Sequence, residues 1–181
     1  MYGNASEETN AVLGSAWARY WARFFDITFY TYPAAFLAGA AFPSFFANPI
    51  FAEPAGDLIV GILLLPLLMI LDAMVIATTG TSLGKAIAGL SVRDLDGKNL
   101  SIELALKRNF LVYIKGYVFG IPILTMIGCI SGYNAIKNNN MTSWDESTES
   151  RVYSSDEGKN RTFLIAIFAI FLQLFVLTLL K

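Results

Sequence analysis

The sequence predicts an all-α integral membrane protein, built as a bundle of about four transmembrane helices with a polar cytoplasmic loop between helices 2 and 3. The chain has 181 residues, of which 55% are hydrophobic, more than the roughly 45–50% of an ordinary soluble domain. Several apolar runs approach or exceed the ~20 residues that span a bilayer. The lipid bilayer is therefore the first expected partner, and a formal net charge of −1 gives no indication of nucleic-acid binding.

The composition also narrows the chemistry. The chain has no histidine and one cysteine, Cys129, so it lacks the base of a serine or cysteine triad and cannot form an intramolecular disulfide. Histidine is also the commonest metal ligand. We therefore expect no enzymatic activity, no metal and no cofactor.

Four apolar spans can be drawn along the chain. A polar tail, residues 1–14, precedes a transmembrane domain of residues 15–152, and residues 153–181 hold a linker and a C-terminal transmembrane helix. The third span contains Lys115 and Pro122, so one kinked helix and two half-helices are both open. No internal repeat is visible, so an inverted-repeat transporter is not supported. The four spans lie at about residues 24–46, 58–79, 109–134 and 162–180.

The distribution of lysine and arginine predicts the orientation. These residues are dense in the 80–109 loop and absent from the connector 47–57, which places the N-terminus and the 80–109 loop in the cytoplasm. Four full crossings, the arrangement we favour, put residues 135–161 outside. A re-entrant third segment would keep them inside, and the basic residues of that loop agree better with this alternative.

A polar stripe opens the first span, in the stretch WARYWARFFDITFY. Arg19, Arg23 and Asp26 stand at positions i, i+4 and i+7, which share one face of a helix. Asp72 lies about 10 Å inside the second span and Lys115 about 9 Å inside the third, at ~1.5 Å per residue. Because intramembrane charges usually face one another, we expect these five side chains to form one cluster near the cytoplasmic side. An interface ion pair on the first helix and a snorkelling Lys115 are the plainer alternatives.

The loop after the second span begins with GTSLGKA, which superficially resembles a phosphate-binding loop. The glycines bracket too few residues, and Ala86 stands where such a loop needs Ser or Thr for magnesium. We interpret the motif as a tight turn at the membrane surface, in which Gly80 caps the preceding helix and Lys85 meets lipid phosphates. The motif consists of Gly80, Thr81, Ser82, Gly84 and Lys85.

The rest of this loop predicts a short hairpin and a helix start. Leu90 and Val92 alternate with polar residues towards an Asp96-Gly97 turn, as in a β-hairpin. Ser101 is the expected N-cap of the helix that leads into the third span.

The motifs together resemble those of the RDD family of membrane proteins over about residues 15–152. WARYWARFFD is similar to the family's opening, where an arginine precedes the first helix and an aspartate lies within it, matched here by Arg19 and Asp26. GTSLGKAIAGLSVRDLDGKNLS resembles the family's G-x-T/S-x-G-K turn and the run after it, and Lys107-Arg108 fits the arginine that follows.

SWDESTESRV is similar to the segment around the second family aspartate, which makes Asp145 the match, with Trp144 where histidine is common. A subgroup with an acidic residue in the second helix, a G-x-x-x-G-x-P third helix and a Trp-Asp pair fits better still. Its residues here are Asp72, Gly116, Gly120, Pro122, Trp144 and Asp145.

Two functions follow from these observations. The first is a small transporter, in which intramembrane carboxylates exchange protons for a cation. Because about four helices form only a thin pathway, a transporter of this size would need to be a homo-oligomer. The second is a scaffold or accessory subunit, whose 80–109 loop binds a membrane partner or anionic lipid. The resemblance implies a bacterial inner (plasma) membrane. The candidate functional residues are Arg19, Arg23, Asp26, Asp72, Lys115 and Asp145.

Overall fold

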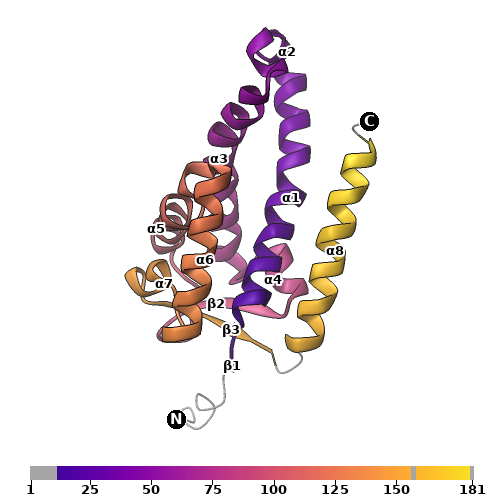
Figure 1. Cartoon of the computed structure of the whole chain (residues 1–181). Coiled ribbons are helices and arrows are strands. Elements are labelled where there is room, and N and C mark those ends of the chain that lie inside the picture. Colours follow the sequence, from indigo (N-terminus) through magenta and orange to yellow (C-terminus); the bar gives the residue numbers. More distant parts are fainter. Residues whose placement is uncertain (1–11, 156–157, 180–181) are drawn as a thin grey trace, which may run out of the picture.

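The computed structural model describes residues 12–155 and 158–179 (Figure 1). Two long antiparallel helices, α1 (Ala16–Ala41) and α3 (Pro54–Thr79), run between a small sheet at one end and the short helix α2 (Pro43–Phe46) at the other. A 3-10 turn, η2 (Pro49–Ala52), completes the connection between them. Residues 1–11 of the predicted polar tail lie outside the described residues.

The ends of these helices follow from local sequence. The Ser15 side chain accepts a hydrogen bond from the Ala18 N–H and caps the start of α1. Helix α3 ends at Gly80, whose φ of 75° is the left-handed conformation that glycine adopts without strain. The predicted caps at Gly80 and Ser101 are both confirmed, since Ser101 accepts from the Leu104 N–H.

Three strands form the sheet that closes one end of the bundle. Strands β1 (Val12–Leu13) and β2 (Leu90–Asp94) both pair antiparallel with β3 (Ser150–Ser154), which lies between them. The predicted hairpin within the 80–109 loop is wrong. Its turn forms, and the Asp94 N–H donates to the Lys98 carbonyl over 3.0 Å, but the partner of β2 is the distant strand β3. Strand β3 also continues across the boundary expected at residue 152.

The third apolar segment folds into two half-helices. Helix α5 (Ile102–Leu111) continues through a π-helical turn, η3 (Val112–Gly116), to the bend η4 (Val118–Gly120), and α6 (Pro122–Asn139) runs back. All three residues of the bend have positive φ angles, of 46°, 62° and 78°.

This segment therefore starts and ends at the sheet. The half-helices pack closely, since a Cβ atom on Gly128 would lie 2.2 Å from the Gly116 carbonyl oxygen. The favoured prediction of a third full crossing, with residues 135–161 on the opposite side, is wrong, because β3 pairs with β2 and keeps both loops at one end.

The structure contains an internal repeat that the sequence analysis missed. The same order of elements occurs twice, sixty residues apart. The first copy is α3, the short helix α4 (Leu83–Ile87) and β2, and the second is α6, α7 (Ser143–Ser147) and β3. Helices α4 and α7 begin at residues 83 and 143, and strands β2 and β3 begin at residues 90 and 150. The left-handed cap Gly80 corresponds to Asn140, whose φ is 61°. At the centre of the sheet Val92 pairs with Val152, so the two copies meet about an approximate twofold axis.

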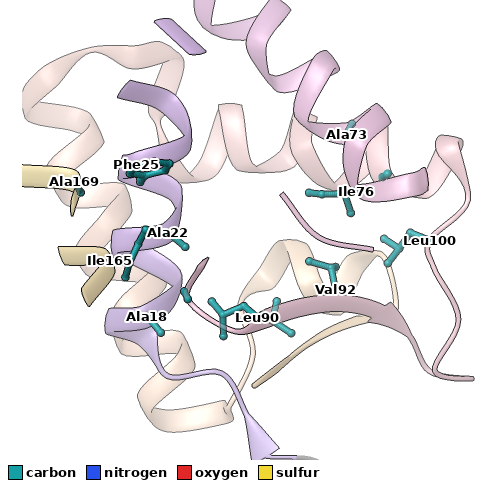
Figure 2. Packing of buried hydrophobic residues seen from close by; sticks show 13 residues of the cluster. Ala18, Ala22, Phe25, Ala73, Ile76, Leu90, Val92, Leu100, Ile165 and Ala169 are labelled. Atoms are coloured by element: carbon teal, nitrogen blue, oxygen red, sulfur yellow. The ribbon is translucent and has the colours of Figure 1, made fainter. Parts of the chain in front are cut away.

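The buried core lies between the sheet and the helices (Figure 2). Helix α8 (Gly158–Leu179) packs along α1 and contributes Ile165 and Ala169, which are fully buried. Figure 2 shows these side chains facing α1, while Leu90 and Val92 of β2 point up towards the helices. Small residues such as Ala22 allow this close approach of α1 and α8.

One of the described helices is long and apolar enough to cross a membrane by length and composition. It is residues Leu58–Thr79 of α3, with a mean hydropathy of 2.7. Helix α1 is as long but carries Arg19, Arg23 and Asp26, and the apolar stretch of α8, Arg161–Val176, is shorter. A helical membrane protein agrees with this pattern, whereas a bundle of four spans is not established.

Candidate functional site: two buried ion-pair clusters

A buried lysine joins two carboxylates from different helices. The Nζ of Lys85, on α4, lies 3.7 Å from the Asp26 carboxylate on α1 and 3.6 Å from Oδ1 of Asp72 on α3. All three side chains are buried. An isolated charge in such surroundings would lose its hydration at a cost of several kcal/mol, so pairing is what keeps these charges inside the protein. We name Asp26, Asp72 and Lys85 the acid–lysine cluster.

The loop motif builds this cluster. The Ser82 hydroxyl donates to Asp26 and accepts from Lys85 Nζ over 2.7 Å, and the Gly84 N–H donates to Asp26 Oδ1 over 2.6 Å. A Cβ atom on Gly84 would lie 2.2 Å from the Ala22 carbonyl oxygen, so only glycine lets α4 come this close to α1. The prediction that Lys85 meets lipid phosphates is wrong, because its ammonium group is buried between two acids.

The first two residues of the motif fasten it to the sheet. The Gly80 carbonyl accepts from the Val92 N–H over 2.7 Å. The Thr81 hydroxyl donates to the Leu90 carbonyl over 2.8 Å. The short helix is thereby fixed between α1 and β2, and the position of Lys85 is set by the backbone.

Asn109 of α5 completes the polar surroundings of Asp72. Its Nδ2 donates to Asp72 Oδ2 and to the Met69 carbonyl, both over 2.9 Å. Two buried oxygens, Asn109 Oδ1 and Asp72 Oδ1, have no hydrogen-bond partner. A cavity of about 10 Å³ bordered by Arg23, Asp26 and Asp72 adjoins the cluster, which is close to the space that one water molecule needs.

A second cluster surrounds Asp145 of α7. Arg108 of α5 donates from Nε and Nη2 to Asp145 Oδ1 over 2.9 and 2.7 Å, and Arg19 of α1 donates to Oδ2 over 3.0 Å. Arg19 also donates to the Gly14 carbonyl over 2.9 Å. Asp145 and Arg108 are buried, and Nη1 of Arg108 has no hydrogen-bond partner. We name Arg19, Arg108 and Asp145 the arginine–aspartate cluster.

Burial and pairing act on the pKa values of Lys85 and Asp145. Burial lowers the pKa of Lys85, and the nearby Asp72 and Asp26 oppose this effect without cancelling it. For Asp145 burial acts to raise the pKa, but Arg108 and Arg19 outweigh it and hold the pKa below its ordinary value. Asp145 therefore stays ionised near neutral pH, whereas Lys85 gives up its proton more readily than a surface lysine.

The structure divides the residues expected in one cluster. Asp26 and Asp72 come together through Lys85, while Arg19 turns to Asp145. Arg23 borders the small cavity with Asp26 and Asp72, and its Nη1 donates to the Met69 sulfur over 3.8 Å. Lys115 is exposed on η3 and joins neither cluster.

Sequence reasoning did not select Arg108 and Asn109 as site residues. Both lie on α5 and are buried, and each reaches one of the clusters. The available signal was the adjacent pair of polar residues at the start of an apolar segment. Among the residues that the structure describes, no three His, Cys, Asp or Glu side chains are grouped so that they could hold a metal ion.

Comparison with known proteins identifies the family of the chain. The family model of the RDD family matches residues 13–149. Comparisons with curated proteins and with solved structures find no match. The matched region spans α1 to α7 and contains both clusters. The chain therefore belongs to the RDD family, and it is a membrane protein.

Proposed function

We propose that the protein exchanges protons for a monovalent cation at the acid–lysine cluster. The observation that carries this proposal is the position of Lys85, whose ammonium group lies 3.7 and 3.6 Å from the carboxylates of Asp26 and Asp72. A buried positive charge between two acids occupies the place that a metal cation would take. Exchange then consists of replacing one charge with the other.

The unpartnered oxygens supply ligands for the incoming ion. Asn109 Oδ1 is buried without a hydrogen bond, and Asp72 Oδ1 has the Lys85 ammonium group at 3.6 Å as its ion-pair partner but no hydrogen bond. A buried oxygen without a hydrogen bond costs free energy. Hard cations bind carboxylate and carbonyl oxygens of this kind. The adjoining cavity of about 10 Å³ gives such an ion a place to enter beside Asp72.

The charge of the cluster does not change in this exchange. When a monovalent cation binds the acids, Lys85 loses its proton and becomes neutral, so one cation enters as one proton leaves. Burial lowers the pKa of Lys85, and this favours release of the proton. Binding in the opposite order returns the proton to Lys85 and releases the cation.

The proposed membrane arrangement follows from the sheet. We propose that α1, α3 and α8 cross a bacterial inner membrane and that the α5–α6 hairpin inserts from the cytoplasmic side. Basic residues accumulate at the sheet end, as the positive-inside rule requires of the cytoplasm. Large apolar side chains are exposed along the outer faces of α3, α6 and α8, and these would face lipid: Leu63, Leu67, Ile123, Ile127, Phe168 and Phe171.

The alternative is a scaffold that binds a partner or anionic lipid through the 80–109 loop. Its support is that Leu95 and Ile102, at the sheet end, are 56% and 53% exposed beside basic residues. Transport has the stronger support, because a scaffold does not need acids buried around a lysine.

Proton movement in proteoliposomes tests the exchange. The purified protein is reconstituted with a pH-sensitive dye inside, and inward gradients of Na⁺, K⁺ or Li⁺ are imposed. We expect the wild type to alkalinise the lumen with at least one cation, Asp72→Asn and Lys85→Gln to lose about tenfold or more of the rate, and the exposed control Lys115→Gln to keep it. A tenfold change corresponds to about 1.4 kcal/mol of barrier.

A thermal melting curve and a gel-filtration profile of each variant separate loss of function from loss of fold. Wild-type liposomes that show no proton movement with any of the three cations would reject the proposal. Unchanged rates in a folded Asp72→Asn variant would reject it as well.

A further inference from the structure

A cavity of about 810 Å³ lies between α1 and α6 and shares Arg23 and Ile27 with the small cavity at the acid–lysine cluster. Its base is formed by α7 and the sheet, where Asp145 and Val152 border it. Trp17 of α1 and Tyr133 of α6 meet at a ring distance of 5.7 Å across this region. The volume is that of a site for a small organic molecule.

The walls and the base of this cavity differ in chemistry. The side walls are aromatic and aliphatic and include Phe24, Ile27 and Met126. Charged side chains border the cavity as well: Arg19, Arg23, Lys85, Arg108 and Asp145. A ligand that filled the whole space would need both an apolar part and a charged group.

The balance of charges gives the sign of that group. The four cations that border the cavity have three carboxylate partners in the two clusters, namely Asp26, Asp72 and Asp145. Four positive and three negative charges leave one positive charge without a counterion. Among the described residues Arg23 is the member of this set that forms no ion pair within 4.0 Å.

Two arginines in this region have hydrogen-bonding capacity for an anion. Arg108 is only 3% exposed, and its buried Nη1 has no hydrogen-bond partner. Arg23 donates to the Met69 sulfur over 3.8 Å, which is a weak bond. A buried guanidinium N–H without a partner, such as the Nη1 of Arg108, is costly unless an acceptor meets it.

We propose that the cavity binds an anionic amphiphile, whose single negative charge meets Arg23 and Arg108 and whose apolar tail lies along the walls between α1 and α6. One negative charge cancels the unbalanced positive charge. The outer face of α6 exposes Ile123 and Ile127, so a tail longer than the cavity would pass onto an apolar surface. The site shares Arg23 with the small cavity at the acid–lysine cluster, but binding at this site is measured without any cation movement.

Tryptophan fluorescence provides the test, since all three tryptophans of the chain, Trp17, Trp21 and Trp144, line the cavity. The full-length protein in a neutral detergent at pH 8 is titrated with a brominated fatty acid and with the brominated alcohol of the same length. Bromine quenches tryptophan on contact. We expect the acid to quench at a concentration at least about tenfold lower than the alcohol, because a hydrogen bond to a charged group is worth about that factor or more.

Substitutions identify the anion-binding groups. We expect Arg23→Gln to raise the half-quenching concentration of the acid to that of the alcohol, Arg23→Lys to retain most of the difference, and the exposed control Lys115→Gln to retain all of it. Equal quenching by acid and alcohol in the wild type would overturn the proposal. An unchanged preference in a folded Arg23→Gln variant would do the same.

Competition distinguishes an amphiphile from a free anion. Acetate and inorganic phosphate are added to the complex with the brominated acid. We expect neither to displace it at a hundred times its concentration. Displacement at an equal concentration would mean that the tail contributes nothing, and would overturn the assignment to an amphiphile. No cation gradient is present, so failure of this test is distinct from failure of exchange.

Discussion

Lys85 and Asp145 occupy the same position in two copies of one structural element and carry opposite charges. Each is the third residue of a short helix, Leu83–Ile87 or Ser143–Ser147, that follows a left-handed helix cap. Each is buried and pairs with a charged residue from the first helix of its own half, which is Asp26 in one case and Arg108 in the other. The two halves thus use one geometry with the polarity reversed.

Close packing of α4 against α1 should make Gly84 intolerant of any side chain. We expect Gly84→Ala to lower the free energy of unfolding by about 1–3 kcal/mol, the usual cost of overpacking, because the new methyl group meets the Ala22 carbonyl oxygen at 2.2 Å. Thermal melting in detergent measures the change. Gly61→Ala is the matched control, since a Cβ atom there has no neighbour within 4 Å. Equal melting temperatures for both variants would contradict the packing described here.

The ionised Asp145 carboxylate should stabilise the folded protein, and this contribution should be lost at low pH, where the carboxylate is protonated. Its folded-state pKa is held below the ordinary value by Arg108 and Arg19, so the contribution is present above about pH 4–5 and is lost as pH falls through the folded pKa. We expect Asp145→Asn to lose about 3–5 kcal/mol at pH 7 by leaving two arginines without their acid. The difference in melting temperature between wild type and variant should shrink below about pH 4. A difference that stays constant from pH 7 to pH 3 would contradict this linkage.

Pairing of β2 with β3 predicts a disulfide cross-link between two loops. Ser91 lies opposite Tyr153, and the Cα atoms of opposite residues in an antiparallel pair are about 4.5–5.5 Å apart, within the range of a disulfide. In a Cys129→Ser background we expect Ser91→Cys and Tyr153→Cys to cross-link on mild oxidation. A pair placed at the two ends of the bundle, Ser91→Cys with Phe45→Cys, should not. Failure of the first pair to link would place the loops on different sides.

The sequence was sufficient for the helical membrane character, the family and the caps. Helix capping at Gly80 and Ser101 is local, because it depends on the residues within one turn of the helix end. The sequence also placed the charged residues Arg19, Arg23 and Asp26 together on the first helix. Its partners could not be deduced, because the long Arg19 side chain turns away from Asp26 towards a residue 126 positions later.

The internal repeat was hidden because its copies share geometry rather than side chains. Glycine caps one long helix and Asn140 the other, and Gly84 corresponds to Trp144. The residues that do agree are few, such as Val92 and Val152 at the centre of the sheet. A search for serine or threonine followed ten residues later by valine would have matched Ser82 and Thr142. Two such matches do not by themselves identify a repeat.

The central position of β3 determines when the sheet can form during synthesis of the chain. Strand β3 is the central strand, yet it is the last of the three to leave the ribosome, so β1 and β2 wait for residues 150–154. The acid–lysine cluster, by contrast, is complete once Lys85 has been made. Arg19, near the start of the chain, has no acid until Asp145 emerges. The acids of the first half are therefore matched early, while the second half closes the sheet and pairs with β1 in one late step.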